Sequence, residues 1–129
     1  MNFSRKYQQI LVVFTISFLA TAAMVGQNIT KKDPDRQLKE AAREATQYWE
    51  KELSLSPKQA TLMEKKILEF AIKKNKLIQS KMREEAKTER LKRLQELEYK
   101  DMRDILTHPQ YERYLALSKE RIRKQNRKQ

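Results

Sequence analysis

The chain contains no glycine after Gly26, and this feature constrains its fold more than any other. Tight β-hairpin turns of the primed types rely on Gly or Asn, and neither stands where a sheet would need it. The three prolines, Pro34, Pro57 and Pro109, each follow an Asp, Ser or Thr by one or two positions. Proline is tolerated in the first turn of a helix because the N–H that it lacks would be unpaired there. The sequence therefore predicts an all-α protein without a sheet.

Two copies of one short pattern mark helix starts. Residues 55–59 and 106–110 both read L-[S/T]-x-x-Q. In a capping box, the Ser or Thr accepts a hydrogen bond from the backbone N–H three residues on, and the Gln there accepts one from the N–H of the cap residue. The leucine before the cap packs on the fourth helical residue as a hydrophobic staple. The six helix-cap residues are Leu55, Ser56, Gln59, Leu106, Thr107 and Gln110.

Apolar residues at three- and four-residue steps predict about four helices within one helical domain, 34–126, with 127–129 as the end of a basic tail. The first helix is expected to start at an Asp33 cap and to run to about residue 53. The second and third are expected to bend apart within 83–89, with Thr88 as a candidate cap, although one continuous rod is an alternative. The small number of aromatic residues favours an elongated helical hairpin that buries further surface as a dimer.

Residues 1–26 have the pattern of a secretory signal peptide. They contain no acidic residue, Arg5 and Lys6 precede an apolar run over 10–25, and small residues end the segment. Cleavage is expected just before Gln27, with cleavage after Ala22 as an alternative, and 27–33 forms a short polar linker. An uncleaved membrane anchor is the rival interpretation, but the run is shorter than the roughly 20 residues of a spanning helix. The protein is therefore expected to be exported.

Basic residues gather on one face of the predicted second helix. The formal net charge is +12, and loss of Arg5 and Lys6 leaves +10. On a helical wheel, this basic face lies opposite the apolar stripe, and Lys87 falls on it as well. Such a face attracts acidic chains at long range and holds them by apolar contact, or it is simply solvated surface. The candidate client-binding residues are Lys58, Leu62, Lys65, Ile72, Lys73, Lys76 and Arg83.

The sequence gives little support for catalysis or cofactor binding. There is no Cys, His108 is the single histidine, and no Gly-rich phosphate loop is present. No cluster of residues has the spacing of a metal site, so neither an enzyme nor a metal or cofactor is expected. Lysine content alone suggests a nucleic-acid binder. Export and the lack of a known nucleic-acid-binding module argue against that interpretation.

The paired motifs at Leu55, Ser56, Gln59 and at Leu106, Thr107, Gln110 resemble the Spy/CpxP family of periplasmic proteins, whose signature is a repeated LTxxQ motif. The signal-peptide pattern and a small, basic, Cys-free helical region fit the same family, over roughly residues 50–120. Two departures are Ser56 in place of the usual Thr, and Pro109 one place later than in the common L-T-P-x-Q form. Ser caps a helix as well as Thr does, and Gln110 keeps its place.

The resemblance implies a periplasmic, cradle-like antiparallel dimer of helical hairpins. It also implies an ATP-independent chaperone, or holdase, that holds unfolded or partly folded client proteins. A regulatory accessory protein that binds the sensor domain of an envelope-stress kinase is the alternative within the same family. The zinc binding of some family members does not carry over, because one His and no Cys supply too few ligands.

Overall fold

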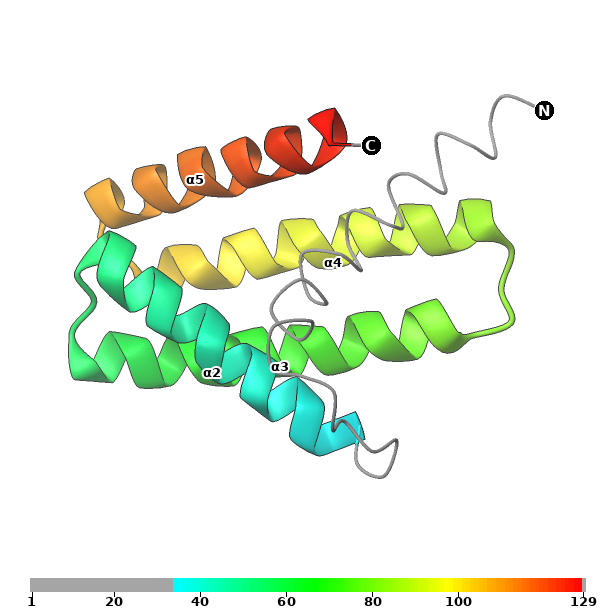
Figure 1. Cartoon of the computed structure of the whole chain (residues 1–129), viewed down its shortest axis with the longest axis horizontal. Helices are drawn as coiled ribbons and strands as arrows, with labels where there is room; N and C mark the ends of the chain where they lie inside the picture. The colour runs from blue at the N-terminus through cyan, green and yellow to red at the C-terminus, as the bar shows by residue number, and fades with distance from the viewer. Residues whose placement is uncertain (1–33, 129) are drawn as a thin grey trace.

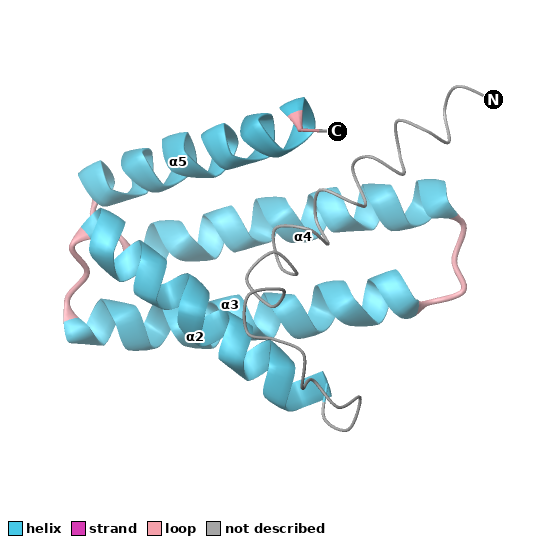
Figure 2. Cartoon of the chain, in the orientation of Figure 1, coloured by secondary structure: helices cyan, strands magenta, loops and turns pink. Residues whose placement is uncertain are grey.

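The computed structural model describes residues 34–128. They form four α-helices and no strand: α2 (Pro34–Leu53), α3 (Pro57–Gln79), α4 (Glu84–Ile105) and α5 (His108–Arg127) (Figure 2). The prediction of an all-α fold with four helices is confirmed. The predicted signal peptide 1–26, the linker 27–33 and the Asp33 cap lie outside the described residues.

Helices α3 and α4 form an antiparallel hairpin, as Figure 1 shows. Helix α2 crosses α3, and α5 runs along α4. The α2–α3 and α4–α5 turns lie together at one end of the hairpin, which we call the motif end because both L-[S/T]-x-x-Q patterns lie there. The α3–α4 loop, residues 80–83, lies at the opposite end, the hairpin tip.

The hydrophobic core lies at the motif end. Trp49 of α2 and Tyr114 of α5 meet edge to face, with 4.7 Å between ring centroids. Leu55 and Leu106, the leucines that precede the two caps, are both buried in this core. Full burial of a leucine contributes roughly 1.5–3 kcal/mol, so each motif stabilises the fold by packing as well as by capping. The buried core cluster consists of Ala42, Trp49, Leu53, Leu55, Met63, Ile67, Met102, Leu106 and Tyr114.

The bend between α3 and α4 lies closer to the N-terminus than the sequence analysis predicts. Helix α3 ends at Gln79, so both the bend within 83–89 and the continuous rod are wrong. Thr88 is not a cap, because its hydroxyl donates to the Glu84 carbonyl inside α4, at 2.9 Å. The loop is instead closed by the buried Lys87, whose Nζ donates to the Ile78 carbonyl at 3.0 Å. This contact joins two helices, and no local sequence pattern indicates it.

Candidate functional site

Both capping boxes form. In the first, the Gln59 N–H donates to Ser56 Oγ at 3.2 Å, and the Ser56 N–H donates to Gln59 Oε1 at 3.0 Å. In the second, the Gln110 N–H donates to Thr107 Oγ1 at 3.4 Å, and the Thr107 N–H donates to Gln110 Oε1 at 2.9 Å. Two N–H groups that a helix start leaves unpaired are therefore satisfied at each motif.

The two motif glutamines also bind each other. Gln59 Nε2 donates to Gln110 Oε1 at 2.8 Å, and Gln110 Nε2 donates to Gln59 Oε1 at 3.3 Å. The second N–H of each amide binds the last residue of a helix: Gln59 donates to the Ile105 carbonyl at 3.2 Å. Gln110 donates to the Leu53 carbonyl at 3.1 Å. Each amide thus uses two donors and two lone pairs, which is its full hydrogen-bonding capacity.

This reciprocal pair explains why the motif occurs twice. Each glutamine caps its own helix and also satisfies the end of the helix before the other motif, Ile105 in one direction and Leu53 in the other. The amides are half-buried, so an unpaired N–H or carbonyl here would lose part of its solvation without compensation. The motif end is therefore a structural junction that positions the α3–α4 hairpin.

The outer face of α3 presents cations and aliphatic side chains to solvent. Lys58, Lys65, Lys73 and Lys76 are exposed. Leu62 is also exposed, with 42% of its surface accessible, and among residues 34–128 only Leu97 is another large apolar side chain in the exposed class. Ile72 adds less apolar surface to this face than Leu62 does, because its side chain is half-buried. Six of the seven candidate client-binding residues therefore lie on α3.

The two remaining basic residues of the wheel are not on that face. Arg83 lies in the hairpin-tip loop, where it is the N-cap residue of α4. Lys87 belongs to α4 and is buried against the Ile78 carbonyl. Both were placed on the second helix because the wheel continued past Gln79, where α3 ends. The basic face of α3 therefore ends near Lys76.

An open groove of about 370 Å³ lies between α3 and α4 near the hairpin tip. Two leucines, Leu77 of α3 and Leu94 of α4, line it together with four cations. The sequence analysis missed the α4 contribution, because the pairing of α3 with α4 depends on where the bend lies. In the sequence, the only feature that could have indicated the α4 side of the groove is the basic pair Arg90 and Arg93 beside Leu94. The lining residues are Lys73, Lys76, Leu77, Arg90, Arg93 and Leu94.

The four groove cations differ in their partners. Lys73 pairs with Glu69 at 3.0 Å, and Arg93 pairs with Glu89 at 3.1 Å, both one turn away on the same helix. These pairs are solvent-exposed, and exposed pairs of this spacing contribute only about 0.3–0.5 kcal/mol. Among the described residues, no carboxylate lies within 4.0 Å of the Lys76 or Arg90 cation.

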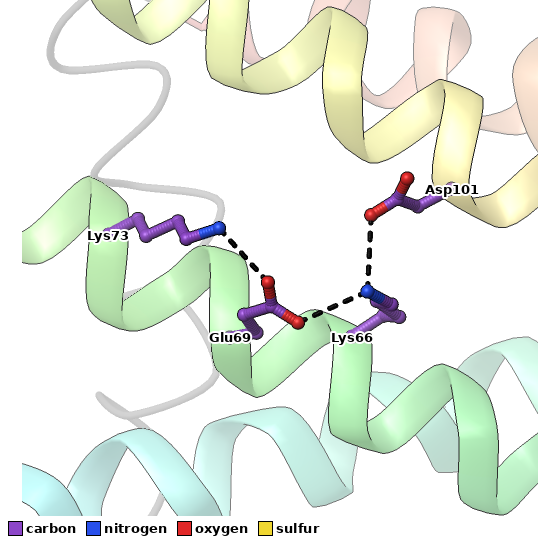
Figure 3. A network of polar contacts seen from close by, with 4 residues as sticks. All are labelled: Lys66, Glu69, Lys73 and Asp101. Carbon is purple, nitrogen blue, oxygen red and sulfur yellow. Dashed lines mark hydrogen bonds and ion pairs between the residues drawn. The ribbon is translucent and has the colours of Figure 1, made fainter.

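A network of ion pairs joins α3 to α4 next to the groove (Figure 3). Lys66 Nζ lies 3.2 Å from a Glu69 carboxylate oxygen and 3.3 Å from Asp101 of α4. Hydrogen bonds from Lys73 and Lys66 lower the pKa of Glu69. Hydrogen bonds to Glu69 and Asp101 raise the pKa of Lys66. The network bridges the two helices through the contact between Lys66 and Asp101.

No group of three or more His, Asp or Glu side chains in 34–128 is placed to hold a metal ion. His108 lies on the surface, where its Nε2 is 3.1 Å from a Glu112 carboxylate oxygen. Across residues 34–128, no helix combines the length and the apolar character needed to span a bilayer.

Comparisons with protein-family models, with curated proteins and with solved structures give no match to this chain. The candidate site is therefore identified from the geometry of this structure alone. That geometry is an exposed surface on the α3–α4 hairpin, in which cations surround small apolar patches.

Proposed function

We propose that the protein is an exported, ATP-independent holdase that binds unfolded or partly folded proteins of the cell envelope, and that it acts as a homodimer. The observation that carries this proposal is the surface of the α3–α4 hairpin. There, Leu62 and the groove leucines Leu77 and Leu94 lie among exposed cations. The repeated L-[S/T]-x-x-Q motif and its resemblance to the Spy/CpxP family support the same function.

The chemistry of this surface suits reversible binding of incompletely folded chains. The net charge of +10 that is expected after loss of Arg5 and Lys6 attracts acidic proteins at long range, and the attraction falls with ionic strength. Apolar patches as small as Leu62 and the groove provide contact without a large hydrophobic area that would cause aggregation. A holdase of this type needs no nucleotide, because binding and release follow from weak contacts alone.

Light scattering of an aggregating client tests the proposal directly. The mature protein, expected to begin at Gln27, should suppress aggregation at stoichiometric amounts, and an absence of suppression would contradict the proposal. Fractionation with N-terminal sequencing tests export, and sedimentation velocity tests the dimer. In a pull-down from envelope extract, many partners support a holdase, whereas one dominant partner supports the regulatory alternative.

Charge reversal tests the surface. The triple variant Lys65→Glu, Lys73→Glu, Lys76→Glu should keep its helicity, because all three residues are exposed, and should lose most of its suppression of aggregation. The matched control reverses three exposed cations of α5, Lys119, Arg123 and Arg127. Both variants change the net charge by the same amount, so a difference between them assigns client binding to the hairpin.

A further inference from the structure

The groove near the hairpin tip has a chemistry more specific than that of the surface around it. Its two leucines, Leu77 and Leu94, lie between cations contributed by both helices. Lys76 and Arg90, one from each helix, have no carboxylate of the described chain within 4.0 Å. Leu97 lies one turn after Leu94 on α4 and leaves 50% of its surface exposed. By helical spacing Leu97 lies on the same side of α4 as Arg90, so an exposed apolar side chain follows the groove along that helix.

We propose that this groove binds an acidic–aliphatic peptide segment, in which a carboxylate pairs with Lys76 and Arg90 and a neighbouring aliphatic side chain contacts Leu77 and Leu94. The proposal rests on the holdase function above and deepens it by naming the chemistry of the client segment. A negative charge on the occupant follows from Lys76 and Arg90, because Lys73 and Arg93 are already paired with Glu69 and Glu89.

The size of the groove favours a peptide over a lipid. From Arg90 to Leu94, the part of α4 that lines the groove, the helix axis rises about 6 Å, at 1.5 Å per residue. That length matches about two residues of extended peptide, at roughly 3.3 Å each, which suits one acidic residue and its aliphatic neighbour. An acyl chain would need a longer and enclosed apolar channel, whereas this groove is short and open to solvent. A carboxylate of the peptide can replace Glu69 at Lys73 or Glu89 at Arg93, because both of these ion pairs are exposed and weak.

Fluorescence anisotropy with labelled eight-residue peptides measures this binding in the full mature protein. The acidic peptide alternates Glu with Leu, and its two matched peptides alternate Lys or Gln with Leu. The acidic peptide should bind at least about tenfold more tightly than either of the others. The double variant Lys76→Gln, Arg90→Gln should weaken that binding about tenfold, because it removes the two cations that lack carboxylate partners.

A control pair separates the groove from overall charge. Lys119→Gln, Arg123→Gln removes two exposed cations from α5 outside the groove and should change the affinity less than about twofold. Leu97→Ser should weaken binding of the acidic peptide about threefold without altering the thermal unfolding midpoint, since Leu97 is half exposed. Equal losses in the groove variant and in the control pair would overturn the proposal.

Two further results would also overturn it. If the groove variant lost self-association in sedimentation velocity, the groove would be an interface between copies of this chain. If it lost binding to vesicles of anionic phospholipid while peptide binding was unchanged, the occupant would be a lipid surface. Failure of the groove is distinguishable from failure of the holdase function: the former leaves suppression of aggregation by the wild-type protein intact, and the latter abolishes it.

Discussion

The two turns at the motif end differ in length by one residue, but their motif residues make the same kinds of contact. Residues 54–56 connect α2 to α3, and residues 106–107 connect α4 to α5. Each turn is followed by a capping box and by a glutamine that binds the end of the helix entering the other turn. The first turn has one extra residue, Ser54, whose φ of 53° lies in the left-handed region.

The extra residue changes how the preceding helix ends. With Ser54 left-handed, the Leu55 N–H reaches back to the Glu50 carbonyl at 3.3 Å, which is the longer bond of a Schellman motif. At the shorter turn, the Leu106 N–H continues the helical pattern to the Met102 carbonyl at 2.9 Å. The two leucines still reach the same core. The comparison shows that the motif fixes the contacts made by its Leu and Gln, while the turn length adapts.

Loss of either motif glutamine should have the largest effect on stability. Gln59→Ala or Gln110→Ala removes four side-chain hydrogen bonds and leaves a helix-end carbonyl, Ile105 or Leu53, without its partner. Each should lower the free energy of unfolding by about 2–3 kcal/mol, measured by urea denaturation. The two losses should not add, because the first variant already removes the contact between the two amides.

Gln47→Ala is the matched control, since Gln47 is exposed on α2 and the same side-chain atoms are removed there. It should change the free energy of unfolding by less than about 0.5 kcal/mol. If the losses from Gln59→Ala and Gln110→Ala were fully additive, the two turns would be independent caps and the reciprocal contact would contribute nothing.

The sequence predicts contacts between residues that are close in the chain, and it does not predict contacts between residues that are far apart in it. The starts of α3 and α5 are readable because Ser56 and Thr107 bind N–H groups only three residues away. The contact between Gln59 and Gln110 spans 51 residues, so the pattern suggests a pair without saying that its members touch. The hairpin tip carries no side-chain cap at Arg83 and is closed by Lys87 instead. Thr88, a good cap residue by type, was therefore a misleading signal.

The candidate site was predictable in part for the same reason. Lys58, Leu62 and Lys65 lie on one helix, so a wheel places them on a common face, and the structure leaves all three exposed. The groove requires knowledge of which residues of α4 face Lys73 and Lys76. That pairing depends on where the bend lies, and Arg90 and Arg93 were consequently missed.

Removal of either cap hydroxyl should have a smaller effect than removal of a glutamine. Ser56→Ala and Thr107→Ala each remove one hydrogen bond to the N–H three residues on, and the glutamine side chain keeps its other contacts. Each should lower the free energy of unfolding by about 1 kcal/mol in urea. The Gly variants at the same positions should lower the free energy of unfolding by only about 0.2–0.4 kcal/mol, because glycine is itself accepted as an N-cap. Equal losses for Ala and Gly would argue that the hydroxyls do not cap.

Ser54→Gly should stabilise the longer turn. A non-glycine residue at a φ of 53° has a steric cost that glycine lacks, and the side chain of Ser54 is exposed. We expect an increase of about 0.5–1 kcal/mol in the free energy of unfolding, seen as a higher thermal midpoint. The same substitution at Ser80, whose φ is −69° and whose hydroxyl donates to the Leu77 carbonyl, should be destabilising. A loss of stability at position 54 would contradict the assigned role of the extra residue.

The smallest predicted effect concerns a side-chain contact that is present at the second turn and has no counterpart at the first. Arg113, three residues after Gln110, donates from Nε to the Glu52 carbonyl at 3.0 Å and pairs with the Glu52 carboxylate at 3.2 Å. The corresponding position three residues after Gln59 is Leu62, and the residue that corresponds to Glu52 is Asp104. Leu62→Arg should therefore recreate the contact at the other turn.

We expect Leu62→Arg to be about 0.5 kcal/mol more stable to urea than Leu62→Gln, which removes the leucine without supplying a guanidinium group. The gain should vanish in combination with Asp104→Asn, because the carboxylate partner is then lost. Both Leu62 variants should bind unfolded clients less well than the wild-type protein, since each removes an exposed leucine from the hairpin surface. If Leu62→Arg gained stability while client binding was unchanged, leucine at this position would have no role in binding, and the difference between the two turns would be a structural accident.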